Sequence, residues 1–285
     1  MKLTERALKI YKTVVDIYNW GDSSDCVTPW DVVRAQVGEL PKFGTFCVPA
    51  AGIGTYVAAL IEHGVEPANI WAVESDSKAF ELGEAMFTRF GVRYTKSDFL
   101  EWAPNVRFDF IIGNPPYGKN AALAVKFLNR SAELSDNIHF VLPRTFRKPS
   151  ILNRIHPHLH LVEDVVVGNE MFGGTILTCA QKWERREEKR SKIETFTQHP
   201  DLSFVCKSEA NLFVGRVGAG PAGKVLVSGY DHFTEQHYFL QVTDTVRDRL
   251  IAIQPKLKEL ARAATVGTPS LSKHELISTY VEGLG

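Results

Sequence analysis

The sequence predicts an α/β fold, in which a mostly parallel sheet carries helices on both faces and a small α/β module follows it. The prediction rests on two observations. Short apolar runs of strand length alternate with stretches of helical periodicity from about residue 44 to residue 167. The run at 108–112 is also apolar enough to be a central strand covered on both faces. Parallel strands need crossover connections, and such crossovers are right-handed.

The predicted elements follow in chain order. Residues 3–20 have apolar side chains at helical spacing, and residues 21–25 end that helix. Thr28 is expected to cap a short second helix, with Pro29 at its first position. Strands are expected at 45–48, 70–73, 93–95, 108–112, 138–142, 162–167 and 176–183, the last two forming an antiparallel pair. Helices are expected at 56–61, 78–90 and 121–134.

A charged segment divides the chain. Residues 182–192 contain six basic and three acidic side chains, a composition typical of a solvated connection. We therefore expect one domain over 1–183 and a small module over 184–285, which is a candidate for target recognition. Its predicted elements are strands at 212–217, 224–228 and 238–242 and helices at 244–253 and 272–280, the last opened by a capping box of Ser272 and Glu275.

The composition limits the class of protein. Hydrophobic residues make up 44% and charged residues 23%, which is typical of a soluble globular protein. No apolar run reaches the roughly 20 residues of a membrane span, and the charged N-terminus predicts a cytoplasmic protein. Lys and Arg together number 33, as do Asp and Glu. This balance argues against tight nonspecific nucleic-acid binding, but it leaves room for a local basic strip.

Metal binding is not expected. The four cysteines are scattered and form no C-x-x-C pair, so they are expected to be reduced, mostly buried thiols. His156, His158 and His160 alternate around a proline and have no acidic partners nearby, which predicts a solvated loop.

A glycine turn indicates a cofactor site after the first strand. Glycines at such a turn let a ligand approach the backbone at the carboxyl ends of the strands. Glu74, followed by Ser75, ends the second strand, where a carboxylate can accept hydrogen bonds from ribose hydroxyls. The residues of the turn that we expect to contact the cofactor are Pro49, Ala50, Gly52 and Gly54.

The third strand is followed by Asp98 and Phe99. Asp98 is placed to accept a hydrogen bond from an adenine amino group, and the Phe99 ring is expected to cover the adenine face. Together with Glu74, these positions predict a nucleoside-type cofactor.

The segment Asn114-Pro115-Pro116-Tyr117 is the most specific signal in the chain and follows the fourth strand. An amino group on an aromatic ring is a weak nucleophile because its lone pair is delocalised. Two acceptors, the Asn114 side-chain oxygen and the Pro115 carbonyl, would favour the tetrahedral geometry and positive charge that develop on nitrogen. Pro115 and Pro116 stiffen the turn, and Tyr117 offers a ring on which a planar base can stack.

The order of these motifs resembles the class I S-adenosylmethionine-dependent methyltransferases, which implies a Rossmann-like, seven-stranded fold and S-adenosylmethionine as cofactor. Thr28 and Pro29 match the family's Thr-Pro element, which lines the methionine end of the cofactor. Asn114 also lies beside the cofactor in that family. The chain departs from the pattern at Val48, where the family usually has an acidic residue that helps to hold the methionine end.

The resemblance extends from residue 26 to residue 183 and looks like the gamma arrangement of N6-adenine DNA methyltransferases from restriction–modification systems and phages. It implies that Phe172 stacks on a flipped adenine opposite Tyr117, and that a restriction endonuclease is a possible partner. The same tetrapeptide also occurs in glutamine methyltransferases that act on proteins. Adenine in structured RNA and an inactive cofactor-binding or nucleic-acid-binding subunit are further alternatives. Basic residues expected to contact phosphates are Lys119, Arg144, Arg147 and Lys148.

Overall fold

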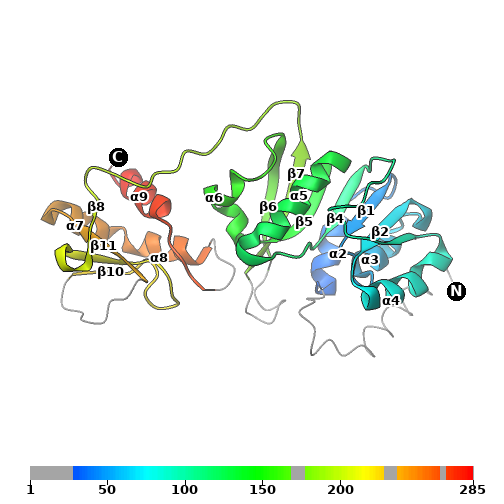
Figure 1. The fold of residues 1–285 in the computed structure, drawn as a ribbon, viewed down its shortest axis with the longest axis horizontal. Coiled ribbons are helices and arrows are strands. Elements are labelled where there is room, and N and C mark those ends of the chain that lie inside the picture. Colours follow the sequence, from blue (N-terminus) through cyan, green and yellow to red (C-terminus); the bar gives the residue numbers. More distant parts are fainter. Residues whose placement is uncertain (1–27, 168–176, 228–235, 264–267, 285) are drawn as a thin grey trace. The chain divides into compact units, whose positions relative to one another are not determined.

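The computed structural model describes residues 28–167, 177–227, 236–263 and 268–284 (Figure 1). They form two compact units. The first runs up to Pro143 and continues over Arg154–Ser191, and the second comprises Arg144–Asn153 and the chain from Lys192 onward. The division therefore falls after Ser191 rather than at residue 183, which lies inside a strand, and the short segment 144–153 groups with the C-terminal module.

The first unit contains a seven-stranded sheet in the order β3-β2-β1-β4-β5-β7-β6. Strands β1 to β5 are parallel, and β7 is antiparallel to both of its neighbours. The predicted antiparallel pair at the end of the domain is thus β6 and β7. The bounds are β1 Phe46–Pro49, β2 Ile70–Glu74, β3 Arg93–Lys96, β4 Phe110–Gly113, β5 Asn137–Pro143, β6 Leu159–Val167 and β7 Thr178–Arg185.

Three helices pack against one face of the sheet: α2 (Trp30–Gly38), α3 (Thr55–His63) and α4 (Ser77–Phe87). Because strand side chains alternate in direction, every second residue of a strand contributes to this core. Phe46 and Val48 of β1 and Ile112 of β4 belong to it, together with apolar residues of all three helices. Phe46, Cys47 and Val48 are all buried, so β1 is covered on both faces.

The α5 helix (Ala122–Leu134) follows the fourth strand. A chain of aromatic contacts leads from the sheet to this helix. Trp71 of β2 packs edge-on against Phe108, Phe108 stacks on Trp102, and Phe99 stacks on Phe127 of α5 with ring centroids 5.2 Å apart. These rings form a second apolar region and hold the loop after β3 against α5.

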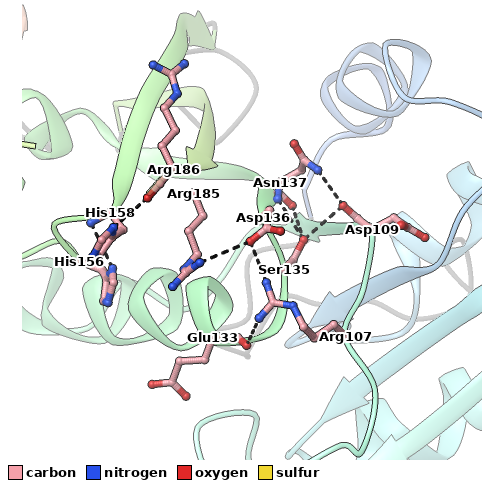
Figure 2. A network of polar contacts seen from close by, with 10 residues as sticks. All are labelled: Arg107, Asp109, Glu133, Ser135, Asp136, Asn137, His156, His158, Arg185 and Arg186. Atoms are coloured by element: carbon pink, nitrogen blue, oxygen red, sulfur yellow. Dashed lines mark hydrogen bonds and ion pairs between the residues drawn. The ribbon is translucent and has the colours of Figure 1, made fainter. Parts of the chain in front are cut away.

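A polar network fixes the edge of the sheet at which β4 and β5 begin and β7 ends (Figure 2). The Ser135 Oγ lies 3.3 Å from the carbonyl oxygen of Asp109 and 3.0 Å from that of Asn137. Arg107 donates to the Asp136 carboxylate at 2.7 Å. These contacts join the starts of two central strands and therefore help to set their register.

The three alternating histidines belong to the same edge. His158 Nδ1 lies 2.8 Å from the Arg186 carbonyl oxygen, and His160 Nε2 lies 2.9 Å from that of Glu188. His160 is part of β6 rather than of a loop, which corrects the prediction for that residue. Within the described ranges, no three His, Cys, Asp or Glu side chains are grouped so that they could hold a metal ion.

The second unit has a four-stranded sheet in the order β10-β9-β11-β8, with β9 and β10 joined as an antiparallel pair. Helix α9 begins with the predicted capping box, because Ser272 and Glu275 bond each other's backbone N–H groups. The bounds are β8 Ser203–Phe204, β9 Leu212–Gly215, β10 Val225–Leu226, β11 His237–Gln241, α6 Pro149–Leu152, α7 Asp244–Ala252, α8 Gln254–Ala263 and α9 Lys273–Glu282.

The second unit has its own apolar core, which includes Leu212, Leu250, Leu257 and Tyr280. In the part of the chain that the structure describes, no helix combines the length and hydropathy that a membrane crossing requires.

Candidate active site

The predicted site residues of the first unit converge at the carboxyl ends of the parallel strands. Strand β1 pairs with β2 on one side and with β4 on the other, so the loops that follow these strands begin side by side. A Cβ added to Gly113 would lie 3.3 Å from the Pro49 carbonyl oxygen. The turn that starts at Asn114 therefore begins directly against the loop after β1, and the two halves of the predicted site meet.

The loop after β1 has an unusual backbone. Ala50 has a φ of +48° and Gly52 a φ of +57°, both in the left-handed region. Such a conformation costs about 1 kcal/mol or more at a non-glycine residue such as Ala50 and persists where surrounding contacts hold it. Two contacts hold this loop at Gly52: its N–H donates to Glu74 Oε2 at 2.7 Å, and its carbonyl accepts from Tyr94 Oη at 2.8 Å.

The two glycines of the turn have different roles. A Cβ at Gly54 would lie 2.4 Å from the Phe87 ring, so this glycine is required for packing of α3 against α4. A Cβ at Gly52 would have no neighbour within 4 Å among the described residues. The open side of the loop is thus at Gly52, where a ligand could approach the backbone.

Glu74 is buried, and both of its carboxylate oxygens accept backbone hydrogen bonds. Oε2 accepts from Gly52 and Oε1 accepts from Asp76, each at 2.7 Å. A carboxylate oxygen has more than one acceptor site, so each can also accept from a hydroxyl group of a ligand. The carboxylate and the open glycine loop together fit the ribose of a nucleoside cofactor.

The loop after β3 agrees only in part with the prediction. Asp98 is exposed at the same end of the sheet, and its Oδ1 accepts from the Leu100 N–H at 2.9 Å. Ser75, next to Glu74, is also exposed. Phe99 is only 2% exposed and stacks on Phe127. The loop turns its ring toward α5, where it packs in the core.

Asn114 presents an acceptor without a partner. Its Nδ2 donates to Thr28 Oγ1 at 3.0 Å. Its Oδ1 is buried and has no hydrogen-bond partner among the residues that the structure describes. A buried acceptor left in this state costs about 1–3 kcal/mol, so in the native protein this atom calls for a partner, such as a ligand group, an ion or a water molecule. Pro115 is buried beside it, Pro116 is exposed, and Tyr117 is half-buried.

Thr28 does not cap α2. The N-cap is Pro29, and no side chain caps the helix. Thr28 instead directs its buried hydroxyl to Asn114, 86 residues away in the sequence.

Two residues that the sequence did not single out are joined by a hydrogen bond between α2 and α3. The Tyr56 hydroxyl of α3 donates to Gln36 Oε1 of α2 at 2.6 Å. Burial raises the pKa of Tyr56, and a side-chain hydrogen bond from Thr28 opposes that rise. Helical periodicity assigns Tyr56 to the core, and no motif marks Gln36, so only the spatial contacts reveal them.

Val48 is 1% exposed and packs within the apolar core on β1. The apolar side chain at position 48 therefore suits its surroundings. Val48 offers no polar group to a cofactor, and Thr28, which was expected at the methionine end, is bonded to Asn114.

The expected phosphate contacts differ in their surroundings. Lys119 is exposed in the segment after the Asn-Pro-Pro-Tyr turn, whereas Arg144 and Arg147 are half-buried in the second unit. Lys148 is ion-paired with the buried Glu275 at 3.3 Å and donates to Ser270. It is thus committed to the interior of the second unit. Phe172 lies outside the described residues.

Comparisons with known proteins bear on this arrangement. No family model matches the chain. It is 37% identical over 93 residues to Type II methyltransferase M.TthHB8I of Thermus thermophilus, a match that covers 32% of this chain and 20% of that protein. It is 32% identical over 101 residues to Type II methyltransferase M.VspI of a Vibrio species, with 32% of this chain and 25% of that protein covered. The matches thus span a quarter or less of these relatives.

Among solved structures, the chain is similar to a Listeria monocytogenes protein (lmo1582) assigned to the class I S-adenosylmethionine-dependent methyltransferases. The TM-score is 0.54 at 12% identity, and the match covers 67% of this chain and 71% of that one. The fold is therefore that of the class I methyltransferases, as the sequence predicted. The resemblance to methyltransferases is confirmed, and the expected cofactor, S-adenosylmethionine, agrees with it.

Proposed function

We propose that this chain is an S-adenosylmethionine-dependent methyltransferase that methylates N6 of adenine in DNA, with the target base flipped out of the duplex. One observation carries the proposal. The Asn114 Oδ1 is a buried acceptor without a partner in the described part of the chain, at the carboxyl end of β4 and against the glycine loop. An amino group that donates a hydrogen to it would relieve the cost of its burial.

When bound, S-adenosylmethionine supplies an electrophilic methyl group. Asn114 Oδ1 and the Pro115 carbonyl each accept one hydrogen of the target amino group. These bonds localise the nitrogen lone pair and stabilise the positive charge that develops as the N–C bond forms and the S–C bond breaks. The bound cofactor would keep the bonding pair of the broken S–C bond, and the extra proton would leave the nitrogen to solvent. No general base is needed.

The target base is held by stacking in this proposal. Tyr117 supplies one ring, and Phe172 supplies the opposite one. A flipped base loses its stacking partners in the duplex, and aromatic side chains replace them. The second unit then supplies target recognition. The proposed phosphate contacts are Arg144 and Arg147 in that unit and Lys119 in the first unit. Lys148 is left out of this set, because its ammonium group already pairs with Glu275.

The groups proposed to bind the cofactor are the glycine loop after β1, the Glu74 carboxylate and the exposed Asp98. The names of the two curated relatives, both Type II methyltransferases, favour DNA as the substrate. Adenine in structured RNA and glutamine in protein would use the same acceptors, so substrate fractions must be compared directly.

The decisive experiment measures transfer of a labelled methyl group to duplex DNA, structured RNA and protein fractions, followed by mapping of the modified base. We expect N6-methyladenine in DNA. If only RNA or only protein is labelled, the substrate is not DNA and the proposed substrate is wrong. If no fraction is labelled, the proposed activity is refuted.

The Asn114→Ala variant tests the catalytic assignment. We expect cofactor binding to persist while turnover falls by about a hundredfold or more, since one well-placed acceptor is worth about 3 kcal/mol in the transition state. Unchanged turnover would remove Asn114 from the mechanism. In parallel, Phe172→Ala should weaken capture of a fluorescent base analogue at the target position, and wild-type capture would refute its stacking role.

A further inference from the structure

Gly52, in the loop after β1, is held from two sides by side chains of other strands. Its N–H donates to Glu74 Oε2 at 2.7 Å, and its carbonyl oxygen accepts from Tyr94 Oη at 2.8 Å. The N–H and the carbonyl belong to the two peptide groups on either side of the Gly52 Cα. Both peptide planes are therefore fixed, and with them the left-handed conformation of Gly52, whose φ is +57°.

Tyr94 belongs to β3, and its side chain reaches the loop along α4. Tyr94 is 9% exposed. Its ring stacks on Phe87 with centroids 6.5 Å apart and packs edge-on against Phe80 at 6.0 Å. A Cβ added to Gly83 would lie 2.4 Å from both Cζ and Oη of Tyr94. Residues 80, 83 and 87 are spaced three and four apart and share one face of α4, so this face fixes the path of the Tyr94 side chain.

The Tyr94 hydroxyl gives a physical reason for glycine at position 83. Glycine in the interior of a helix is less favourable than alanine, because it loses more backbone freedom on folding. Gly83 is the seventh of the 11 residues of α4, so it caps neither end of the helix. An alanine would favour the helix but would bring its Cβ into the Tyr94 hydroxyl. Helix α4 thus accepts a weak helix former at the position that the hydroxyl passes.

We propose that Tyr94 and Gly83 are positioning residues for S-adenosylmethionine. The Tyr94 hydroxyl holds the Gly52 carbonyl, and Gly83 leaves room for that hydroxyl. The inference rests on the proposed function, because it concerns the glycine loop that we assign to the cofactor. It adds two residues that act on the cofactor only through this loop.

The Tyr94 contact decides which side of the loop is offered to a ligand. With its N–H bonded to Glu74 and its carbonyl to Tyr94, Gly52 keeps its Cα side open, where a Cβ would have no neighbour within 4 Å in the described part of the chain. Without the hydroxyl, a part-buried carbonyl would lose its donor, and the peptide would turn toward water. A loop that is fixed before binding has no ordering cost to meet when the ligand arrives.

The first test is Tyr94→Phe, which removes the hydroxyl and keeps the ring that packs against Phe80 and Phe87. We expect the Kd for S-adenosylmethionine, measured by calorimetry, to rise about tenfold, in line with the loss of one net hydrogen bond. The KM for the cofactor should rise with the Kd, while kcat at saturating cofactor stays within about twofold of wild type. An unchanged Kd, or a lower kcat at an unchanged Kd, would overturn the inference.

Gly83→Ala acts on the same contact from α4. The substitution should strengthen an ordinary helix, but here we expect the Kd to rise about tenfold, because the added Cβ displaces Tyr94 Oη. If both residues act through one hydrogen bond, the double variant should bind no more weakly than the weaker single variant. Additive losses, or wild-type affinity in Gly83→Ala, would refute the proposed path. Gly83→Ala also provides the answer if Tyr94→Phe fails to fold.

Ser135→Ala is the matched control. It too removes a buried hydroxyl that donates to a backbone carbonyl of the first unit (Figure 2). Ser135 lies at the edge where β4 and β5 begin, which is the opposite edge of the sheet from the glycine loop. This variant should lose stability and keep the wild-type Kd. If it raised the Kd as much as Tyr94→Phe, general loosening of the unit would explain both results, and Tyr94 would not be a positioning residue.

A second readout needs neither cofactor nor turnover. In cofactor-free protein with 15N-labelled glycine, the Gly52 amide hydrogen should exchange with solvent about tenfold faster in Tyr94→Phe than in wild type, because the loop that brings it to Glu74 is less fixed. Wild-type exchange in this variant would contradict the inference. If wild-type protein binds no S-adenosylmethionine, the proposed cofactor site fails, and the exchange measurement alone decides whether Tyr94 fixes the loop.

Discussion

The Glu74→Gln substitution tests the cofactor loop most directly. Glu74 accepts the Gly52 and Asp76 N–H groups at 2.7 Å through separate carboxylate oxygens. A glutamine keeps one acceptor oxygen and turns an NH2 group toward the other N–H. One charged hydrogen bond is lost, worth about 1.5–3 kcal/mol, and one buried donor is left without an acceptor.

The loss should appear in two measurements. We expect the free energy of unfolding to fall by about 2 kcal/mol, and the Kd for S-adenosylmethionine to rise on the order of a hundredfold, because loop geometry and the ribose contact are weakened together. Calorimetry gives the Kd. Urea unfolding followed by tryptophan fluorescence reports on the first unit alone, because all five tryptophans belong to it.

Glu62→Gln is the matched control for Glu74→Gln. Glu62 pairs with Arg34 at 3.2 Å, but both side chains are partly solvated, and exposed pairs contribute less than about 1 kcal/mol. This variant should leave cofactor affinity unchanged. If Glu74→Gln bound S-adenosylmethionine as tightly as wild type, Glu74 would be a structural anchor only, and the cofactor site would have to lie elsewhere.

Two further predictions concern stability. Lys148→Met should destabilise the second unit by about 3 kcal/mol, because the buried Glu275 would keep its charge without a cationic partner, although it still accepts the Ser272 N–H; hydrogen exchange in α9 measures this, and wild-type protection there would contradict it. Burial, aided by Lys182, lowers the pKa of His139 to about 4, below its ordinary value of 6.5. The unfolded chain therefore binds the extra proton first, and stability falls as the pH drops from 6.5 toward 4. His139→Gln should flatten that part of the urea midpoint profile, and an unchanged slope would exclude His139 as the cause.

Much of the fold was predictable because its signals are local. The central strands are continuous apolar runs, and a strand buried on both faces requires such a run, as the burial of Phe46, Cys47 and Val48 illustrates. The capping box at Ser272 is likewise a pattern of four adjacent residues. Helix α8 was missed because Pro255, three residues beyond the end of α7, resembles a break, although proline is accepted in the first turn of a helix.

The residues of the candidate site were also predictable only in part. Glu74 and Asn114 were predictable because each stands at the end of a parallel strand, and the fold alone brings those ends together. The direction of the Phe99 ring was not predictable, because the loop after β3 can turn a side chain either toward a ligand or toward the core. In the structure the ring stacks on Phe127 in the core.

The contact that Thr28 makes could not be predicted from its local sequence. Its sequence context, a threonine before Pro29, equally fits a helix cap, and a side-chain cap would use the hydroxyl as an acceptor for the helix backbone. In the structure Pro29 occupies the cap position, and the same hydroxyl accepts from Asn114. The hydrogen bond that holds the Asn114 side chain thus comes from a residue 86 positions away, which no local sequence pattern reveals.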